Sequence, residues 1–296
     1  MPRLEKRRLQ QLRGSSYVLT LPKDWVEEMG LGKGSSVLLL SDPGVFCVVP
    51  SDRGGGFAVE IDTRDVGGEE GVEEAVRLFY TLGAVSMRIK SPGASYRLLP
   101  RIRRLRAELH GVMATVLNED EVQVSFSGEL FTSLEEGVRS FLVSLATAAR
   151  AAASYAVTGD KEAVMSEVSE CLLQARALSR YVSWMISRPS RDLIIQATPL
   201  AGVLSARLID LCASLEEALK QGISREDAET FASLVSELAE SVDKGYEDAG
   251  RVWRRVVEKA AATPRERSAA HQLLRSLAHA SEALKHLALM RLLPVR

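Results

Sequence analysis

One stretch of this 296-residue sequence decides the fold of its N-terminal end: Gly14-Ser15-Ser16-Tyr17-Val18-Leu19-Thr20-Leu21-Pro22-Lys23-Asp24-Trp25-Val26. Gly-Ser-Ser is a turn signal, and the β-branched and apolar residues after it predict a strand over 17–21. Pro22 ends this strand and favours the start of a helix, because its missing N–H costs nothing in a first turn. The spacing therefore predicts a short helix over 23–29, with Gly30 as its C-terminal cap.

The residues that follow continue this pattern of short elements. A turn over 31–34 precedes a strand over 36–40, and a tight turn at Asp42-Pro43-Gly44 leads to a third strand over 45–49. Roughly 50 residues of short strands around one helical turn bury little apolar surface, and domains this small often gain their core by oligomerising. We therefore expect an obligate dimer.

A basic segment precedes the first turn. Residues 3–13 contain five arginines and lysines against a single acidic residue, Glu5, whereas the whole chain has a net charge of −1. Any DNA affinity must then come from such a local patch, because lysine and arginine neutralise phosphates and arginine also reads guanine edges. The candidate DNA-binding residues, which precede, enter or flank the first predicted hairpin, are Arg7, Arg8, Arg13, Lys23 and Lys33.

Two alternatives to DNA binding stay open for this segment. The charges also suit a solvated strand edge that discourages aggregation. In addition, the short helix after Pro22 carries Asp24, Glu27 and Glu28, which favours a domain that serves chiefly as a dimerisation unit.

The rest of the chain divides into a mixed part and a helical part. Strands over 57–61 and 85–89, helices over 69–82 and 96–109, and a hairpin of 113–117 with 122–126 predict a small α+β module. From residue 132 onward the pattern is helical. It predicts five helices, over about 132–157, 161–187, 191–220 with a kink at Pro199, 224–261, and 263–294, which would form an antiparallel bundle.

The residues at Arg8-Leu9-Gln10, 14–26, Gly30-Leu31 and Gly34 resemble a SpoVT/AbrB-type swapped-hairpin domain. More narrowly, they resemble the version at the N-terminus of archaeal PhoU-like phosphate-uptake regulators. The resemblance implies a multidomain α+β protein. Residues 1–52 would form a dimeric swapped-hairpin β-barrel, 57–130 an α+β connecting module and 132–294 an all-α, PhoU-like antiparallel bundle.

That resemblance also implies a function. We expect a dimeric DNA-binding regulator of transcription and phosphate uptake, with a helical domain that receives a signal. The alternative is an adaptor without DNA affinity, whose bundle docks onto a phosphate transporter or sensor kinase while the N-terminal domain only joins two copies. The connection to phosphate comes wholly from the resemblance.

We expect no metal and no cofactor. In PhoU proteins, acidic E-x-x-x-D motifs on paired helices hold metal clusters. Here Arg176 and Arg180 stand where the first motif is expected, and only Asp210, with Ala206 one turn before it, stands at the second. The family's metal site is therefore not carried over to this chain.

Three further clusters have both a functional and an ordinary interpretation. The basic cluster could hold a phosphate or an acidic partner, and the acidic cluster and the histidine cluster could hold a metal ion with ligands from neighbouring helices, but a solvated helix face is the commoner outcome for such residues. They are a basic run (Arg97, Arg101, Arg103, Arg104, Arg106), an acidic stripe (Glu237, Glu240, Asp243, Glu247) and a histidine face (His279, Glu282, His286).

The sequence predicts a cytoplasmic protein that is not an enzyme. No catalytic motif stands out, and Gly54-Gly55-Gly56 fits neither nucleotide-binding glycine pattern. No apolar run is long enough to span a bilayer, and Pro2-Arg3 opens a charged segment instead of a signal peptide. Cys47, Cys171 and Cys212 are far apart in the sequence with apolar neighbours, which favours buried thiols in a reducing compartment.

Overall fold

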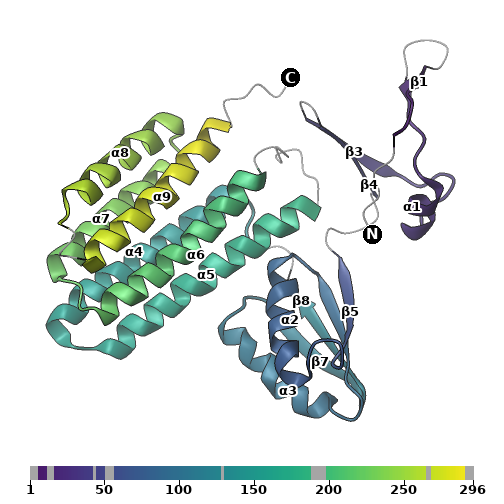
Figure 1. Ribbon diagram of the computed structural model, residues 1–296, viewed down its shortest axis with the longest axis horizontal. Helices are drawn as coiled ribbons and strands as arrows, with labels where there is room; N and C mark the ends of the chain where they lie inside the picture. The colour runs from purple at the N-terminus through teal and green to yellow at the C-terminus, as the bar shows by residue number, and fades with distance from the viewer. Residues whose placement is uncertain are drawn as a thin grey trace. The chain divides into compact units, whose positions relative to one another are not determined.

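The computed structural model describes residues 6–11, 17–42, 45–50, 57–127, 130–187, 198–264 and 268–290 (Figure 1). The chain divides into two compact units: residues 1–41 with 46–54, and residues 42–45 with 55–296. We refer to them as the N-terminal unit and the larger unit. Within the described residues, no helix is long and apolar enough to cross a membrane.

The N-terminal unit contains two separate two-stranded sheets. β1 (Gln10–Gln11) pairs antiparallel with β2 (Tyr17–Val18), so that Gln10 lies opposite Val18. β3 (Val37–Asp42) pairs with β4 (Val45–Pro50). Between the two sheets, α1 (Lys23–Glu28) begins directly after Pro22, as predicted. The predicted strand over 17–21 is shorter than expected, and its last residues lead into the helix without pairing.

The α+β part of the larger unit is a four-stranded mixed sheet with helices packed against it (Figure 1). Its elements in chain order are β5 (Ala58–Asp62), α2 (Glu69–Thr81), β6 (Ser86–Lys90), α3 (Ser95–Arg104), a 3₁₀ turn (Leu105–Ala107), β7 (Val112–Asn118) and β8 (Glu121–Phe126). The strand order is β5-β6-β8-β7, in which β5 and β6 are parallel and the other neighbours antiparallel. These elements agree with the predictions, except that α3 gives way to the 3₁₀ turn instead of continuing to residue 109.

Buried and more exposed residues alternate along the strands, so the sheet has one buried face and one exposed face. Met87 and Ile89 of β6, and Val122 and Val124 of β8, are fully buried among apolar side chains of α2 and α3. The residues between them in the two strands are exposed or half-buried. The helices therefore cover one face of the sheet, as the period of two along a strand requires.

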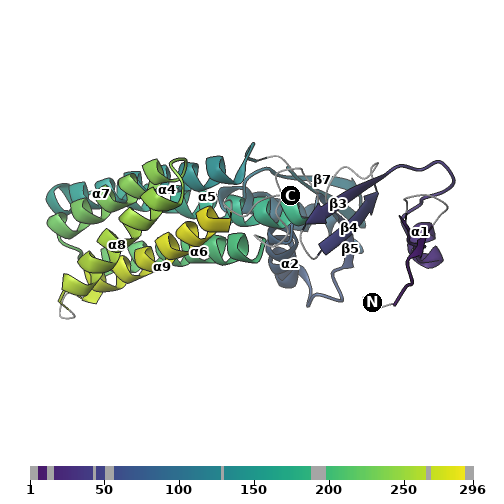
Figure 2. The same ribbon diagram turned by 90° about the horizontal axis from the view of Figure 1, so that it is seen from above.

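Six helices follow in the described part of the chain and lie alongside one another in a bundle (Figures 1 and 2). They are α4 (Leu134–Thr158), α5 (Lys161–Ser187), α6 (Thr198–Lys220), α7 (Arg225–Ser241), α8 (Tyr246–Ala262) and α9 (Ser268–Met290). Their inward side chains form one continuous apolar core that all six helices contribute to.

One of the helix predictions was wrong. The single helix predicted over 224–261 is in fact two, α7 and α8, because the chain turns at Gly245, whose φ of 93° strongly favours glycine. Pro199 is the second described residue of α6, and the residues before Thr198, on which the predicted kink depends, lie outside the described part of the chain. The start predicted at residue 191 lies outside the described residues.

Capping explains the start of the bundle. The Ser133 hydroxyl accepts a hydrogen bond from the Glu136 N–H at 3.1 Å, and the Glu136 carboxylate accepts one from the Thr132 N–H at 2.7 Å. These bonds satisfy donors that a helix N-terminus otherwise leaves unpaired. At the other end of α4, Gly159 adopts a φ of 71° and ends the helix.

Arg180 of α5 joins the bundle to the sheet part of the larger unit. Its side chain is fully buried, and its guanidinium donates hydrogen bonds at 3.0 Å to the carbonyl oxygens of Ser127 and Tyr80. The guanidinium carbon also lies 4.9 Å from the ring centre of Tyr80 and 5.4 Å from that of Phe126. Within the described residues no carboxylate pairs with this cation, and its burial lowers the pKa of Arg180 from the usual value.

Candidate nucleic-acid interface

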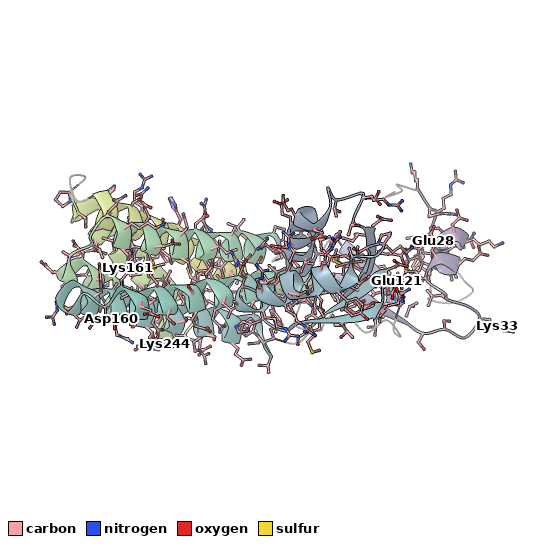
Figure 3. The ribbon with its side chains drawn as sticks, turned by 90° about the horizontal axis from the view of Figure 1, so that it is seen from below. Glu28, Lys33, Glu121, Asp160, Lys161 and Lys244 are labelled. Atoms are coloured by element: carbon pink, nitrogen blue, oxygen red, sulfur yellow. The ribbon has the colours of Figure 1, made fainter. Side chains whose placement is uncertain are left out.

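The basic residues before β1 are exposed in the N-terminal unit. Arg7 and Arg8 lie in the extended segment that leads into β1, and Lys33 lies in the turn before β3. Figure 3 labels Lys33 and Glu28, whose side chains extend from this unit. Arg13 lies outside the described residues. The structure thus presents Arg7, Arg8 and Lys33 to solvent, from where cations can approach a phosphate backbone.

Lys23 has an acidic neighbour on α1. Its ammonium lies 3.5 Å from the Glu27 carboxylate one helical turn away, and both side chains are mostly exposed. Exposed pairs of this kind are weak, so Lys23 keeps its mobility but presents little net charge together with Glu27. Asp24 and Glu28 add two more exposed carboxylates to α1.

The charges of this end of the chain are therefore segregated. The first 50 residues contain seven lysines and arginines and five acidic residues, and five of the seven cations precede Gly14. The acidic residues other than Glu5 follow Pro22. A polyanion would accordingly be attracted by the segment that leads into β1 and repelled by α1.

Apolar side chains of the N-terminal unit are unusually exposed. Leu9, Tyr17, Leu39 and Phe46 are 56–66% exposed, and Pro50 is the one buried residue among those that the structure describes in this unit. A monomeric soluble domain rarely leaves so many large apolar groups in water. The described strands and helix of this unit therefore share no buried core among the described residues.

Sequence reasoning did not identify these apolar residues individually, although it predicted the dimer from the size of the domain. A signal was present: Leu38, Leu39 and Leu40 form an apolar run within a predicted strand, and a strand needs such a run only where both faces are covered.

Two arginines of the second basic run form ion pairs within the larger unit. Arg101 of α3 contacts Glu73 of α2 at 2.7 Å and Glu69 at 3.5 Å, and Arg97 contacts Glu69 at 3.2 Å. Arg106 donates to the Val112 carbonyl oxygen at 3.1 Å. Arg97, Arg101 and Arg106 thus connect α3 to α2 and β7, while Arg103 and Arg104 are exposed.

The acidic stripe is likewise divided among ion pairs. Glu237 pairs with Arg255, Glu240 with Lys244 at 3.7 Å, and Asp243 with Arg139. Each of these carboxylates therefore faces a cation instead of converging on a common point.

The histidine face and the positions compared with the PhoU metal motifs bring no ligands together either. Among the described residues, no three histidine, cysteine, aspartate or glutamate side chains gather where they could hold a metal ion. Asp210 lies 3.5 Å from Arg207, and Arg176 lies 3.3 Å from the Glu108 carboxylate in the sheet part of the larger unit. Arg176 and Arg180 thus connect α5 to the sheet part.

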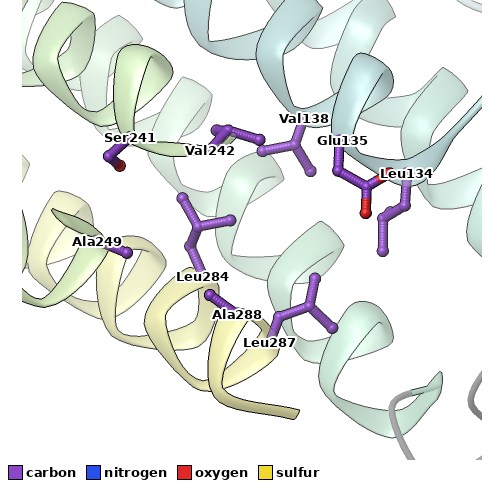
Figure 4. Close-up of a pocket in the computed structure, with 9 residues that line it drawn as sticks. All are labelled: Leu134, Glu135, Val138, Ser241, Val242, Ala249, Leu284, Leu287 and Ala288. Carbon is purple, nitrogen blue, oxygen red and sulfur yellow. The ribbon is translucent and has the colours of Figure 1, made fainter. Parts of the chain in front are cut away.

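One small pocket opens between four segments of the bundle (Figure 4). Aliphatic side chains of α4, α9 and the α7–α8 region form most of its wall, and Glu135 is its single charged lining residue. A ligand site generally needs several converging polar groups to fix an occupant, and this pocket offers few. We therefore place no site there.

Comparison with known proteins bears on the N-terminal end alone. Residues 10–55 match the family model described as antidote-toxin recognition MazE, bacterial antitoxin. A search of curated proteins and a search of solved structures each gave no match. The family match identifies a MazE/AbrB-type domain at the N-terminus, which agrees with the resemblance drawn from the sequence and is consistent with a DNA-binding regulator.

Proposed function

We propose that the protein is a homodimeric, non-enzymatic DNA-binding regulator of the cytoplasm. In this proposal the N-terminal units of two copies close into a swapped-hairpin barrel. The observation that carries it is the lack of a core in one copy: Tyr17, Leu39 and Phe46 are more than half exposed within a domain of the MazE/AbrB type. Covering these side chains with a second copy would supply the missing core, because burial of apolar area is the main favourable term in association.

DNA would contact the segment that leads into β1. Arg7, Arg8 and Arg13 from two copies would give six cations around a two-fold axis, and each phosphate neutralised adds about 0.9 to the slope of log affinity against log salt. Lys33 would flank this surface. Lys23 would contribute less, because Glu27 is its neighbour on α1.

The larger unit would receive the signal that regulates DNA binding. Its helical part supports a sensing or docking role, since it presents a long helical surface to partners. That the signal is phosphate, and that the bundle is PhoU-like, rests on the sequence resemblance alone.

Fluorescence anisotropy tests the DNA contact. Full-length protein is titrated into labelled pooled genomic fragments at two salt concentrations, with the mass measured by light scattering. We expect a dimer with salt-dependent binding. In an Arg7/Arg8/Arg13→Ala variant, the slope should fall by about 0.9 for every phosphate that the variant no longer neutralises, and affinity should approach background.

A variant of equal charge change provides the control. Three exposed cations of the bundle each pair with a carboxylate four residues away in the sequence: Lys220, Arg225 and Lys244. Replacing these three by alanine alters net charge by the same amount but leaves the N-terminal unit intact. Equal loss of affinity in both triple variants, or unchanged binding in the first, would overturn the proposed DNA site.

The second candidate function is an adaptor, and the acidic helix favours it. Exposed Asp24, Glu27 and Glu28 would repel a phosphate backbone brought near α1. In that case the barrel joins two copies, and the bundle docks onto a protein such as a phosphate transporter or sensor kinase component. A dimer that binds DNA weakly and uniformly at physiological salt, and that co-purifies with a membrane transport component, would favour this function over the first.

A further inference from the structure

Two cysteines that are distant in the sequence meet in the core of the bundle. Cys171 lies in α5 and Cys212 in α6, 41 residues further along the chain, and their Sγ atoms are 2.9 Å apart. Cys171 is 0% and Cys212 2% exposed, and both belong to the continuous apolar core. The sequence predicts three separate buried thiols; burial is confirmed for Cys171 and Cys212, which are however in contact, and it is wrong for Cys47, which is partly exposed.

The distance between the two sulfur atoms is shorter than the packing of two thiols in a core requires. A thiol is a weak hydrogen-bond donor, so two thiols gain little from facing each other in an apolar core. A disulfide needs its sulfur atoms about 2.05 Å apart, and the two Sγ atoms would have to move by less than about 1 Å to reach that distance. Small side-chain rotations on two packed helices can supply such a movement.

We propose that Cys171 and Cys212 form an intramolecular disulfide that fastens α5 to α6 when the chain meets a disulfide oxidant, whereas in a reducing compartment the pair remains as two thiols. In the reaction, one cysteine thiolate attacks a disulfide of an external acceptor and releases one of its thiols. The second cysteine then displaces the other. The Cys171–Cys212 bond forms, the acceptor's S–S bond breaks, and the two electrons and two protons of the cysteine pair leave with the acceptor as two thiols.

Burial controls when this exchange takes place. The neighbouring Cys212 thiol and the removal of water both raise the pKa of the Cys171 thiol above its usual range, so the folded pair contains very little thiolate. The acceptor also cannot reach a side chain that is fully buried. The bond should therefore form while α5 and α6 are apart, and it should resist reductant once the bundle has closed.

Cysteine counting by mass spectrometry tests the bond. The full chain is unfolded in guanidinium chloride, refolded with oxidised glutathione as the acceptor, unfolded again without reductant and treated with N-ethylmaleimide. Cys47, which is partly exposed, is the internal reference. Before reduction we expect at most one maleimide per chain, on Cys47, which either stays free or carries one glutathione, and after reduction three, with residues 171 and 212 in one cross-linked peptide. Three maleimides before reduction, or glutathione on each cysteine separately, would overturn the proposal.

Thermal unfolding separates a covalent bond from simple packing. Cys171→Ala, Cys212→Ala and the double variant are compared with the oxidised and the reduced wild-type protein, and Cys47→Ala is the matched control. A disulfide that closes a loop of this length stabilises the folded state mainly by reducing the entropy of the unfolded chain. We therefore expect the three cysteine variants of the pair to melt roughly 5–15 °C below oxidised wild type. Against reduced wild type, most of this difference should vanish. An equal difference under both conditions would mean that the cysteines only pack; if a variant does not fold, the cysteine count still decides.

Discussion

Replacement of Arg180 tests how the two parts of the larger unit are joined. Arg180→Met keeps an unbranched apolar stem but removes the guanidinium, whose two hydrogen bonds satisfy the carbonyl oxygens of Tyr80 and Ser127. Arg180→Lys keeps a positive charge, but a single ammonium group lacks the planar fork that reaches both carbonyls.

The magnitudes follow from the interactions of the guanidinium. The Tyr80 carbonyl also accepts a hydrogen bond from the Gly83 N–H at 3.0 Å, so Arg180→Met leaves only the Ser127 carbonyl without its described donor, at a cost of about 1–3 kcal/mol. Removing the cation from the rings of Tyr80 and Phe126 adds roughly 0.5–2 kcal/mol. Removing the charge itself returns part of this cost, since no carboxylate among the described residues compensates the buried ion. We therefore expect Arg180→Met to lose about 1–3 kcal/mol of stability. Arg180→Lys keeps the buried charge, so no desolvation cost is recovered, and this variant should lose more stability, about 3–5 kcal/mol.

Urea unfolding gives these free energies, and hydrogen exchange gives their location. Amides at the end of β8 and at the C-terminal turn of α2 should exchange faster in both variants, while α7 and α8 keep their protection. Arg150→Met is the matched control, because Arg150 is exposed and bonds only to the Ser236 hydroxyl among the described partners; it should change stability by less than about 0.5 kcal/mol. If Arg180→Lys is as stable as wild type, or more stable than Arg180→Met, the reasoning from the guanidinium fork is wrong.

Three smaller changes test other contacts of the larger unit. Gly83 has a φ of 83°, and an added Cβ would lie 2.9 Å from the Trp184 nitrogen of α5, so Gly83→Ala should cost about 2–4 kcal/mol in urea unfolding; a cost below about 0.5 kcal/mol would show that α2 and α5 do not approach so closely. Ser133→Ala removes the cap of α4 and should cost about 1 kcal/mol, restored by Ser133→Asp. The Arg77 hydrogen bond lowers the pKa of Glu108 from its usual value, so this group stabilises the fold above the ordinary glutamate pKa and ceases to do so as pH falls through its folded pKa. Since the carboxylate is partly exposed, Glu108→Gln should reduce the loss of stability on acidification by less than about 1 kcal/mol, and at pH values below the folded pKa of Glu108 it should leave stability unchanged. A variant with the same acid dependence as wild type would contradict the pairing.

The sequence by itself determined the elements that depend on a few neighbouring residues. Pro22 begins α1, the Ser133 cap begins α4, Gly159 ends it, and the alternation in β8 places Val122 and Val124 on the buried face. These signals are readable because turns, caps and strand faces are set by backbone geometry within about one turn or two residues. The excess of cations before Gly14 is local for the same reason.

Only the tertiary structure decided which distant residues meet. Cys171 lies beside Cys212, Arg101 faces Glu73, and Arg180 bonds to the backbone of the sheet part, although none of these partners is near in the sequence. Such pairs follow from how the helices pack, and packing depends on side chains throughout the core at once. The exposed apolar side chains of the N-terminal unit belong to the same class, since the exposure of a side chain depends on which neighbours the folded chain places around it.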